Sequence, residues 1–180
     1  ISNFSFNKSN SKKRGIVIKE IIMEVSPNQR DAMEWLITYM PEADVKNLSH
    51  DYLIENSEYA FKAKNHFQWA KDLPDELFLN YVLPYSSLNE RRDRWRKDFF
   101  YKFSKIVENA NSAYEAAAIL NNQIFTILGV EYSTKRPKAD QSPYESIDAK
   151  LASCTGLSFL LIDACRSVGI PARFVGTPMW

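Results

Sequence analysis

The chain has 180 residues, of which 45% are hydrophobic, and its formal net charge is +1 at pH 7. This length provides for one or two domains with a hydrophobic core, and the near-neutral charge supplies no global field to attract nucleic acid. No apolar run approaches the ~20 residues needed to cross a bilayer. Two histidines, two cysteines and five glycines form no metal-ligand spacing and no phosphate-binding loop. We therefore expect no cofactor, no metal, no nucleic acid partner and no membrane span.

Residues 1–14 are polar and basic and lack the apolar segment of a signal peptide, so we expect a flexible N-terminal tail. A periplasmic or secreted location is favoured if a signal peptide was removed. The sequence leaves both the compartment and the oligomeric state open. Residues 15–25 combine helical spacing with strand-favouring residues, and either structure fits them.

Helix-start signals predict a helical N-terminal region over residues 15–86. The run Ser26-Pro-Asn-Gln29 has a serine cap, a proline at the first helical position and a glutamine at the third. It predicts a helix that ends at Pro41. We expect a second helix over 49–70 and a shorter one over 77–83.

No Gly/Ser-rich linker follows this region, and we place the domain boundary between residues 86 and 87. Ser87-Leu-Asn-Glu90 resembles a capping box and predicts a helix over 87–105. This segment holds seven basic and three acidic residues with aromatic residues between them. Such patches can bind nucleic acid, but Trp95, Phe99 and Phe103 have helical spacing. We therefore expect a buried aromatic face with arginines directed to solvent.

Two further capping boxes occur in the second half of the chain. Ser112-Ala-Tyr-Glu115 predicts a helix that ends at Gly129, and Ser142-Pro-Tyr-Glu145 predicts a short helix just before a cysteine. Residues 131–143, between these helices, form the clearest loop. The loop is either an ordinary connection or a segment that shapes access of substrate.

The last thirty residues carry the strongest functional signal. Ser153 is a suitable N-cap for a helix with an apolar stripe, and Gly169 is well placed to end that helix in a left-handed conformation. Pro171 cannot continue the helix, and residues 172–175 are predicted to form a short strand. This arrangement places Cys154 in or next to the first turn of the helix.

A thiol at this position has a favourable electrostatic environment. The unpaired N–H groups and the positive end of the helix dipole favour a thiolate. The backbone N–H groups of Cys154 and Thr155 are candidates to stabilise the oxyanion of a tetrahedral intermediate. The alternative is that Cys154 is a small buried hydrophobic residue. Cys165, about 16 Å further along the helix, is too distant for a disulfide and is interpreted as a core residue.

The run Ala152-Ser-Cys154-Thr-Gly, the apolar helix and the segment Gly169-Ile-Pro-Ala-Arg-Phe-Val-Gly176 resemble the core of the transglutaminase-like superfamily, and its bacterial members most closely. The resemblance implies an α+β, cysteine-protease-like fold with a Cys-His-Asp triad, in which Cys154 matches the nucleophile. Residues 87–180 would then be the N-terminal half of the core. The part present is expected to be mainly α-helical with few strands.

The family's histidine and aspartate come from strands that follow this segment, but only seven residues follow Arg173, and none is His or Asp. His50 and His66 precede the cysteine and match no family position. We therefore expect the chain to be the front part of a longer protein.

The leading hypothesis is a thiol enzyme that cleaves or transfers at an amide or peptide bond through a Cys154 thioester, with a peptide or protein substrate. One alternative is an inactive domain of the same fold that binds peptide or glycan. Another is a helical interaction module in which the cysteine only fills space.

Overall fold

The computed structural model describes residues 8–176, and their contacts divide the chain into two compact units, 1–58 and 59–180. The division falls within the fourth helix. The elements, in chain order, are α1 (Lys8–Ile22), η1 (Pro27–Gln29), α2 (Arg30–Tyr39), α3 (Glu42–Asn47), α4 (His50–His66), α5 (Gln68–Lys71), α6 (Asp75–Tyr81), α7 (Trp95–Ser104), α8 (Ala113–Leu128), β1 (Glu131–Tyr132), α9 (Pro143–Ala149), β2 (Leu151–Ala152) and α10 (Cys154–Ser167).

In the first unit, α1 packs against α2 and α3. The ambiguous residues 15–25 are helical as far as Ile22. Lys8–Arg14, which we expected within a flexible tail, begin the same helix, whereas residues 1–7 lie outside the described part. Arg14 donates hydrogen bonds to the carbonyl oxygens of Ile37 (2.6 Å) and Thr38 (3.2 Å) near the end of α2. These bonds satisfy carbonyls that the helix itself leaves unpaired.

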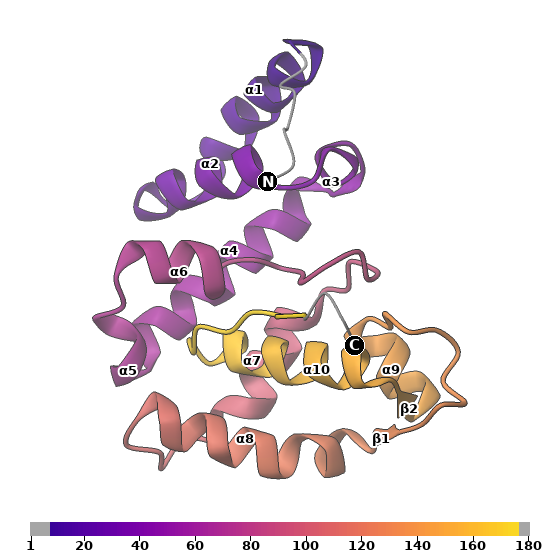
Figure 1. Ribbon diagram of the computed structural model, residues 1–180. Helices are drawn as coiled ribbons and strands as arrows, with labels where there is room; N and C mark the ends of the chain where they lie inside the picture. Colours follow the sequence, from indigo (N-terminus) through magenta and orange to yellow (C-terminus); the bar gives the residue numbers. More distant parts are fainter. Residues whose placement is uncertain (1–7, 177–180) are drawn as a thin grey trace. The chain divides into compact units, whose positions relative to one another are not determined.

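The second unit contains a continuous hydrophobic core around α10. This helix packs against α7, α8 and α9, as Figure 1 shows. Buried residues from several elements meet in the core, among them Trp95, Phe99, Phe103, Leu120, Ile124, Leu160 and Ala164. Because α10 is covered on most sides, its position is set by tertiary packing rather than by helix propensity alone.

Two short parallel strands lie directly before the functional segment. β1 pairs with β2 in the register Glu131 to Leu151 and Tyr132 to Ala152. β2 ends one residue before Ser153, so the pairing fixes the approach to α10. The described part of the unit is therefore helical with a small parallel sheet, as expected for the mainly α portion of an α+β core.

Three capping predictions are confirmed. The Ser142 hydroxyl and the Glu145 side chain form the complete capping box of α9. Ser112 accepts a hydrogen bond from the N–H of Glu115 at the start of α8, and Gly129 ends this helix at φ +65°. Ser153 caps α10.

The prediction at Ser26 is confirmed in position only, and the prediction at Ser87 is wrong. Helical structure begins at Pro27 with Ser26 as the N-cap, but the Ser26 side chain makes no cap bond. Gln29 is buried instead, and its Oε1 accepts a hydrogen bond from Ser57 Oγ (3.0 Å). The helix predicted from residue 87 begins only at Trp95. There, the buried Glu90 carboxylate accepts the N–H groups of Ser87 (2.6 Å) and Leu88 (2.8 Å) and so stabilises a non-helical turn.

Three further expectations are corrected. The helix predicted over 49–70 is interrupted at Phe67, between α4 and α5. Residues 172–175 form no strand, because the Ala172 N–H pairs with the carbonyl of Tyr81 at the end of α6 rather than with a neighbouring strand. The aromatic face of α7 is buried as predicted, but Arg96 is only 3% exposed and does not point to solvent.

Within residues 8–176, none of the helices combines the length and the apolar character that crossing a lipid bilayer requires.

Candidate functional site

Cys154 is the first residue of α10 and its side chain is exposed. Ser153 adopts an extended conformation before it, and the Ser153 hydroxyl accepts the Gly156 N–H at 3.0 Å. The N–H groups of Cys154 and Thr155 have no hydrogen-bond partner among the described residues. The helix start thus presents a thiol and two backbone donors to solvent together.

Gly156 allows the first turn of α10 to pack closely against its neighbours. A Cβ on Gly156 would lie 3.1 Å from the Cβ of Ala152 and 3.2 Å from the hydroxyl oxygen of Ser146. These distances are tighter than ordinary contacts, so glycine is required for the first turn of α10 to pack closely against α9 and β2. The close packing holds the turn that carries Cys154 while the thiol itself stays exposed.

The second cysteine has the opposite environment. Cys165 is 7% exposed and belongs to the hydrophobic core. Burial raises the pKa of the Cys165 thiol to about 12, which keeps it protonated at physiological pH. The structure therefore confirms the interpretation of Cys165 as a core residue, and it excludes the alternative in which Cys154 is sealed inside packed side chains.

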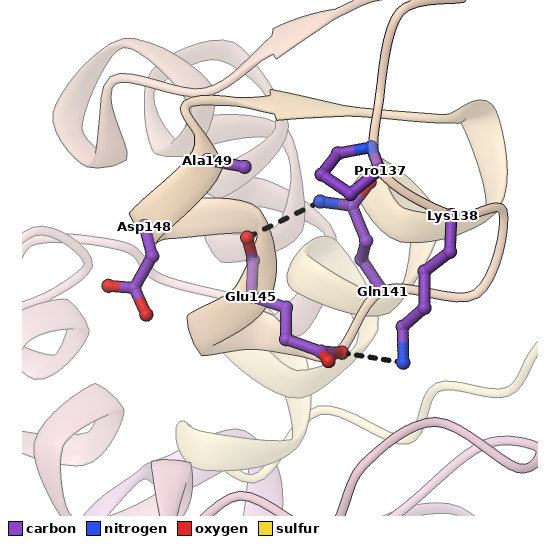
Figure 2. A pocket seen from close by; sticks show the side chains of 6 residues that line it. All are labelled: Pro137, Lys138, Gln141, Glu145, Asp148 and Ala149. Atoms are coloured by element: carbon purple, nitrogen blue, oxygen red, sulfur yellow. Dashed lines mark hydrogen bonds and ion pairs between the residues drawn. The ribbon is translucent and has the colours of Figure 1, made fainter.

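A pocket lies between α9 and the polar loop, residues 133–142, that connects β1 to α9. Its volume is about 350 Å³, and its lining residues come from the loop and from α9: Pro137, Lys138, Gln141, Glu145, Asp148 and Ala149. Figure 2 shows Lys138 paired with Glu145 across the pocket, and this ion pair measures 2.9 Å. Hydrogen bonds from Ser142 and Lys138 outweigh the effect of burial and lower the pKa of Glu145. Cys154 is not among the lining residues.

His66 is not brought to Cys154. His66 contacts Phe67 with a ring-centroid distance of 4.7 Å, and Phe67 stacks on Trp69, whose indole N–H donates to the carbonyl of Val168. Val168 follows the C-terminal end of α10, about 20 Å along the helix from Cys154. His66 therefore lies near the wrong end of α10 to act as a base.

His50 belongs to the first unit. Its Nδ1 lies 3.3 Å from a carboxylate oxygen of Glu24, and its Nε2 lies 3.7 Å from one of Glu20. These contacts place it in a surface cluster formed by α4, α1 and the turn that follows α1. In the described range, no three His, Cys, Asp or Glu side chains come together as a metal site would need.

The segment after α10 is held by two arginines. Gly169 has φ +76°, as predicted for the residue that ends the helix. Arg166 donates from Nε to the carbonyl of Ala172 (3.0 Å), and the Arg173 guanidinium lies over the Tyr81 ring at 5.4 Å. This segment is therefore fixed against α6 and α10 without any strand pairing.

Sequence reasoning missed three buried polar residues of this unit. Arg96 donates to the carbonyls of Val82 (2.8 Å), Leu83 (3.2 Å) and Pro84 (2.9 Å). Arg166 and Asp163 lie within α10, where a charged residue inside an apolar run was the available signal.

A fourth residue, Gln141, lies in the polar loop and is only 1% exposed. Its amide nitrogen donates to the carbonyls of Leu151 (2.9 Å) and Glu145 (3.3 Å). Nothing in the local sequence marks this residue, because a glutamine in a polar loop is ordinarily exposed.

Comparison with known families gives one match. Residues 102–180 match the family model described as the transglutaminase-like superfamily. The matched segment includes α8, α9, both strands, α10 and Cys154. No curated protein matches the chain, and no solved structure matches it.

Proposed function

Since residues 102–180 match the model of the transglutaminase-like superfamily, we propose that the protein is a thiol enzyme that cleaves or transfers at an amide or peptide bond. Cys154 is the nucleophile of this proposal. The substrate class is a peptide or a protein.

One observation carries the proposal: Cys154 is exposed at the start of a buried helix, next to two unpaired backbone N–H groups. The unpaired N–H groups and the positive end of the helix dipole lie beside the thiol, an environment in which cysteines are commonly reactive. The remainder of α10 is packed in the core, so the thiol is presented on a rigid element.

The reaction proceeds in two steps. The Cys154 sulfur attacks the carbonyl carbon of the amide, and the N–H groups of Cys154 and Thr155 stabilise the oxyanion that develops. The C–N bond breaks, the amine leaves with a proton, and a thioester remains. Water or a second amine then attacks the thioester, which releases the acid or a new amide and restores the thiol.

Proton transfer in both steps needs a general base. The second unit presents His66 near the far end of α10, and the family supplies a histidine and an aspartate from later strands. We therefore assign the base and its aspartate to those family strands. With water as the acceptor the enzyme is a peptidase or amidase, and with an amine it is an acyltransferase.

The test uses p-nitrophenyl acetate, an activated acyl donor, with the longer protein. We expect mass spectrometry to find one acetyl group on Cys154 and absorbance to show continued release of p-nitrophenol. Cys154→Ala should abolish both signals, and Cys165→Ala, which changes the buried cysteine, should retain them.

Equal acetylation of the protein with and without Cys154 would contradict the proposal. Acetylation of Cys154 without turnover would instead favour an inactive domain that retains the thiol for binding.

A further inference from the structure

The polar loop is attached to the turn that carries Cys154. The Ser153 hydroxyl, which caps α10, also donates a hydrogen bond to the carbonyl of Ala139. Two residues later in the loop, the Gln141 amide donates to Leu151 in β2 and to Glu145 in α9. Figure 2 shows the second of these bonds, with the Gln141 side chain extending toward α9. The loop is therefore bonded to α9, to β2 and, through Ser153, to the start of α10.

Gln141 also packs against the first turn of α10. A Cβ on Gly156 would lie 3.7 Å from the Cβ of Gln141, so the glutamine stem and this turn are in direct contact. The Gln141 Nε2 donates a hydrogen bond to the carbonyl of Leu151, and Leu151 pairs with Glu131 in the small sheet. β2 is thus bonded both to Gln141 and to β1.

We propose that Gln141 is a positioning residue for Cys154, an inference that rests on the proposed function. Its amide fixes β2, and β2 fixes Ser153 and the direction in which α10 begins. The backbone N–H groups at the helix start then keep a fixed position next to the thiol. If the Gln141 bonds are lost, the first turn of α10 loosens and these groups no longer keep that position.

The expected direction of the effect follows from exposure. Cys154 is already exposed, so a looser turn adds little access for a reagent, whereas it displaces the backbone N–H groups at the helix start. The reactivity of Cys154 should therefore fall rather than rise.

The experiment compares Gln141→Leu with Gln123→Leu, a matched change at an exposed position of α8. Leucine retains the stem of the glutamine and removes its two donors. Amide hydrogen exchange is measured at Gly156 and Leu157, and alkylation of both cysteines by iodoacetamide is measured in the same samples. Cys165 reports on unfolding, since a buried thiol is alkylated only when the core opens.

We expect Gln141→Leu to slow the alkylation of Cys154 about fivefold and to speed exchange at Gly156 by a similar factor, the effect of losing one net buried hydrogen bond. Cys165 should stay protected, and Gln123→Leu should match the unchanged protein. Ser153→Ala should act like Gln141→Leu, and Ser153→Thr, which retains the hydroxyl, should restore at least half of the reactivity.

Each other outcome overturns the inference. Unchanged alkylation of Cys154 with faster exchange makes Gln141 a structural contact only, and faster alkylation of both cysteines makes it a general stabiliser. Unchanged exchange at Gly156 shows that the amide does not hold the turn. The proposed function fails separately, if Cys154 in the unchanged protein is no more reactive than free cysteine.

Discussion

The two ends of α10 have contrasting environments. At the N-terminal end, Cys154 is exposed and the backbone is held by side chains from a polar loop. At the C-terminal end, Cys165 is buried, and Gly169 approaches the preceding helices so closely that a Cβ would lie 2.7 Å from the Cβ of Ala70. The N-terminal end of α10 thus exposes its cysteine, and the C-terminal end fixes the helix in the core.

This contrast indicates how a small unit presents a reactive thiol. An exposed cysteine on a loop moves with the loop, whereas Cys154 begins a helix whose far end is fixed in the core. Arg166 strengthens the anchor through hydrogen bonds to the carbonyls of Ser86 (3.0 Å) and Ala172 (3.0 Å). Changes at the anchored end should therefore reduce stability, and changes at the open end should mainly alter reactivity.

The largest effect is expected at the anchor. Gly169→Ala places a Cβ in contact with Ala70 and forces a non-glycine residue to φ +76°. We expect the free energy of unfolding, measured in urea, to fall by about 3 kcal/mol. Gly129→Ala is the control, since its φ is +65° and a Cβ there meets nothing within 4 Å. It should cost about 1 kcal/mol. Equal losses would show that close packing at Gly169 does not anchor the helix.

Removal of Arg96 should have the next largest effect. Arg96→Met removes the guanidinium that donates to the carbonyls of Val82, Leu83 and Pro84, and only the last of these also accepts a hydrogen bond from Arg166. We expect a loss of about 2 kcal/mol in urea unfolding. Lys97→Met changes the neighbouring exposed residue on the same helix and should alter stability by less than about 0.5 kcal/mol. A loss below 0.5 kcal/mol for Arg96→Met would contradict the role given to these bonds.

Asp163 tests the interior of α10 through pH. Burial raises the pKa of Asp163 well above its ordinary value. Among the described residues, neither of its carboxylate oxygens accepts a hydrogen bond, and Arg166 Nη1 lies 3.8 Å from Oδ1. Because the pKa of Asp163 is raised in the folded state, its neutral carboxyl contributes fully to stability below the ordinary pKa. This contribution is lost as the pH rises through the folded-state pKa. The gain in stability from Asp163→Asn should therefore grow from pH 4 to pH 8 and reach about 1 kcal/mol. A gain that does not change with pH would refute this assignment.

The smallest effect is expected at the pocket. The pKa of Glu145 is lowered, so its contribution to stability is present above the ordinary pKa and is lost as pH falls through the lowered value. Glu145→Gln retains an acceptor for the Ser142 N–H and removes the charge beside Lys138. We expect a loss of about 0.5 kcal/mol at pH 7 that disappears in acid, as thermal melts would show. A loss that persists at pH 3 would come from packing instead.

The sequence was most informative where local chemistry decides the structure. The boxes at Ser112 and Ser142 and the cap at Ser153 lie at real helix starts, because one side chain satisfies a nearby backbone group. The same logic failed at Ser87, where the Glu90 carboxylate binds the same kind of N–H group in a turn that is not helical.

The candidate site was predictable in part for the same reason. Cys154 was identified from the cap, the apolar helix and the residues that follow it. Gln141 was not, because its two acceptors lie on elements that only the tertiary fold brings together. Arg96 was missed for a similar reason, since its carbonyl partners lie more than ten residues away.

The most direct test of the account is the alkylation of the unchanged protein by iodoacetamide at pH 7, with each cysteine followed by mass spectrometry. We expect Cys154 to react about tenfold faster than free N-acetylcysteine, because its exposed thiol lies beside unpaired N–H groups at a helix start, while the buried Cys165 remains unmodified. Reaction of Cys154 at or below the rate of N-acetylcysteine would contradict it.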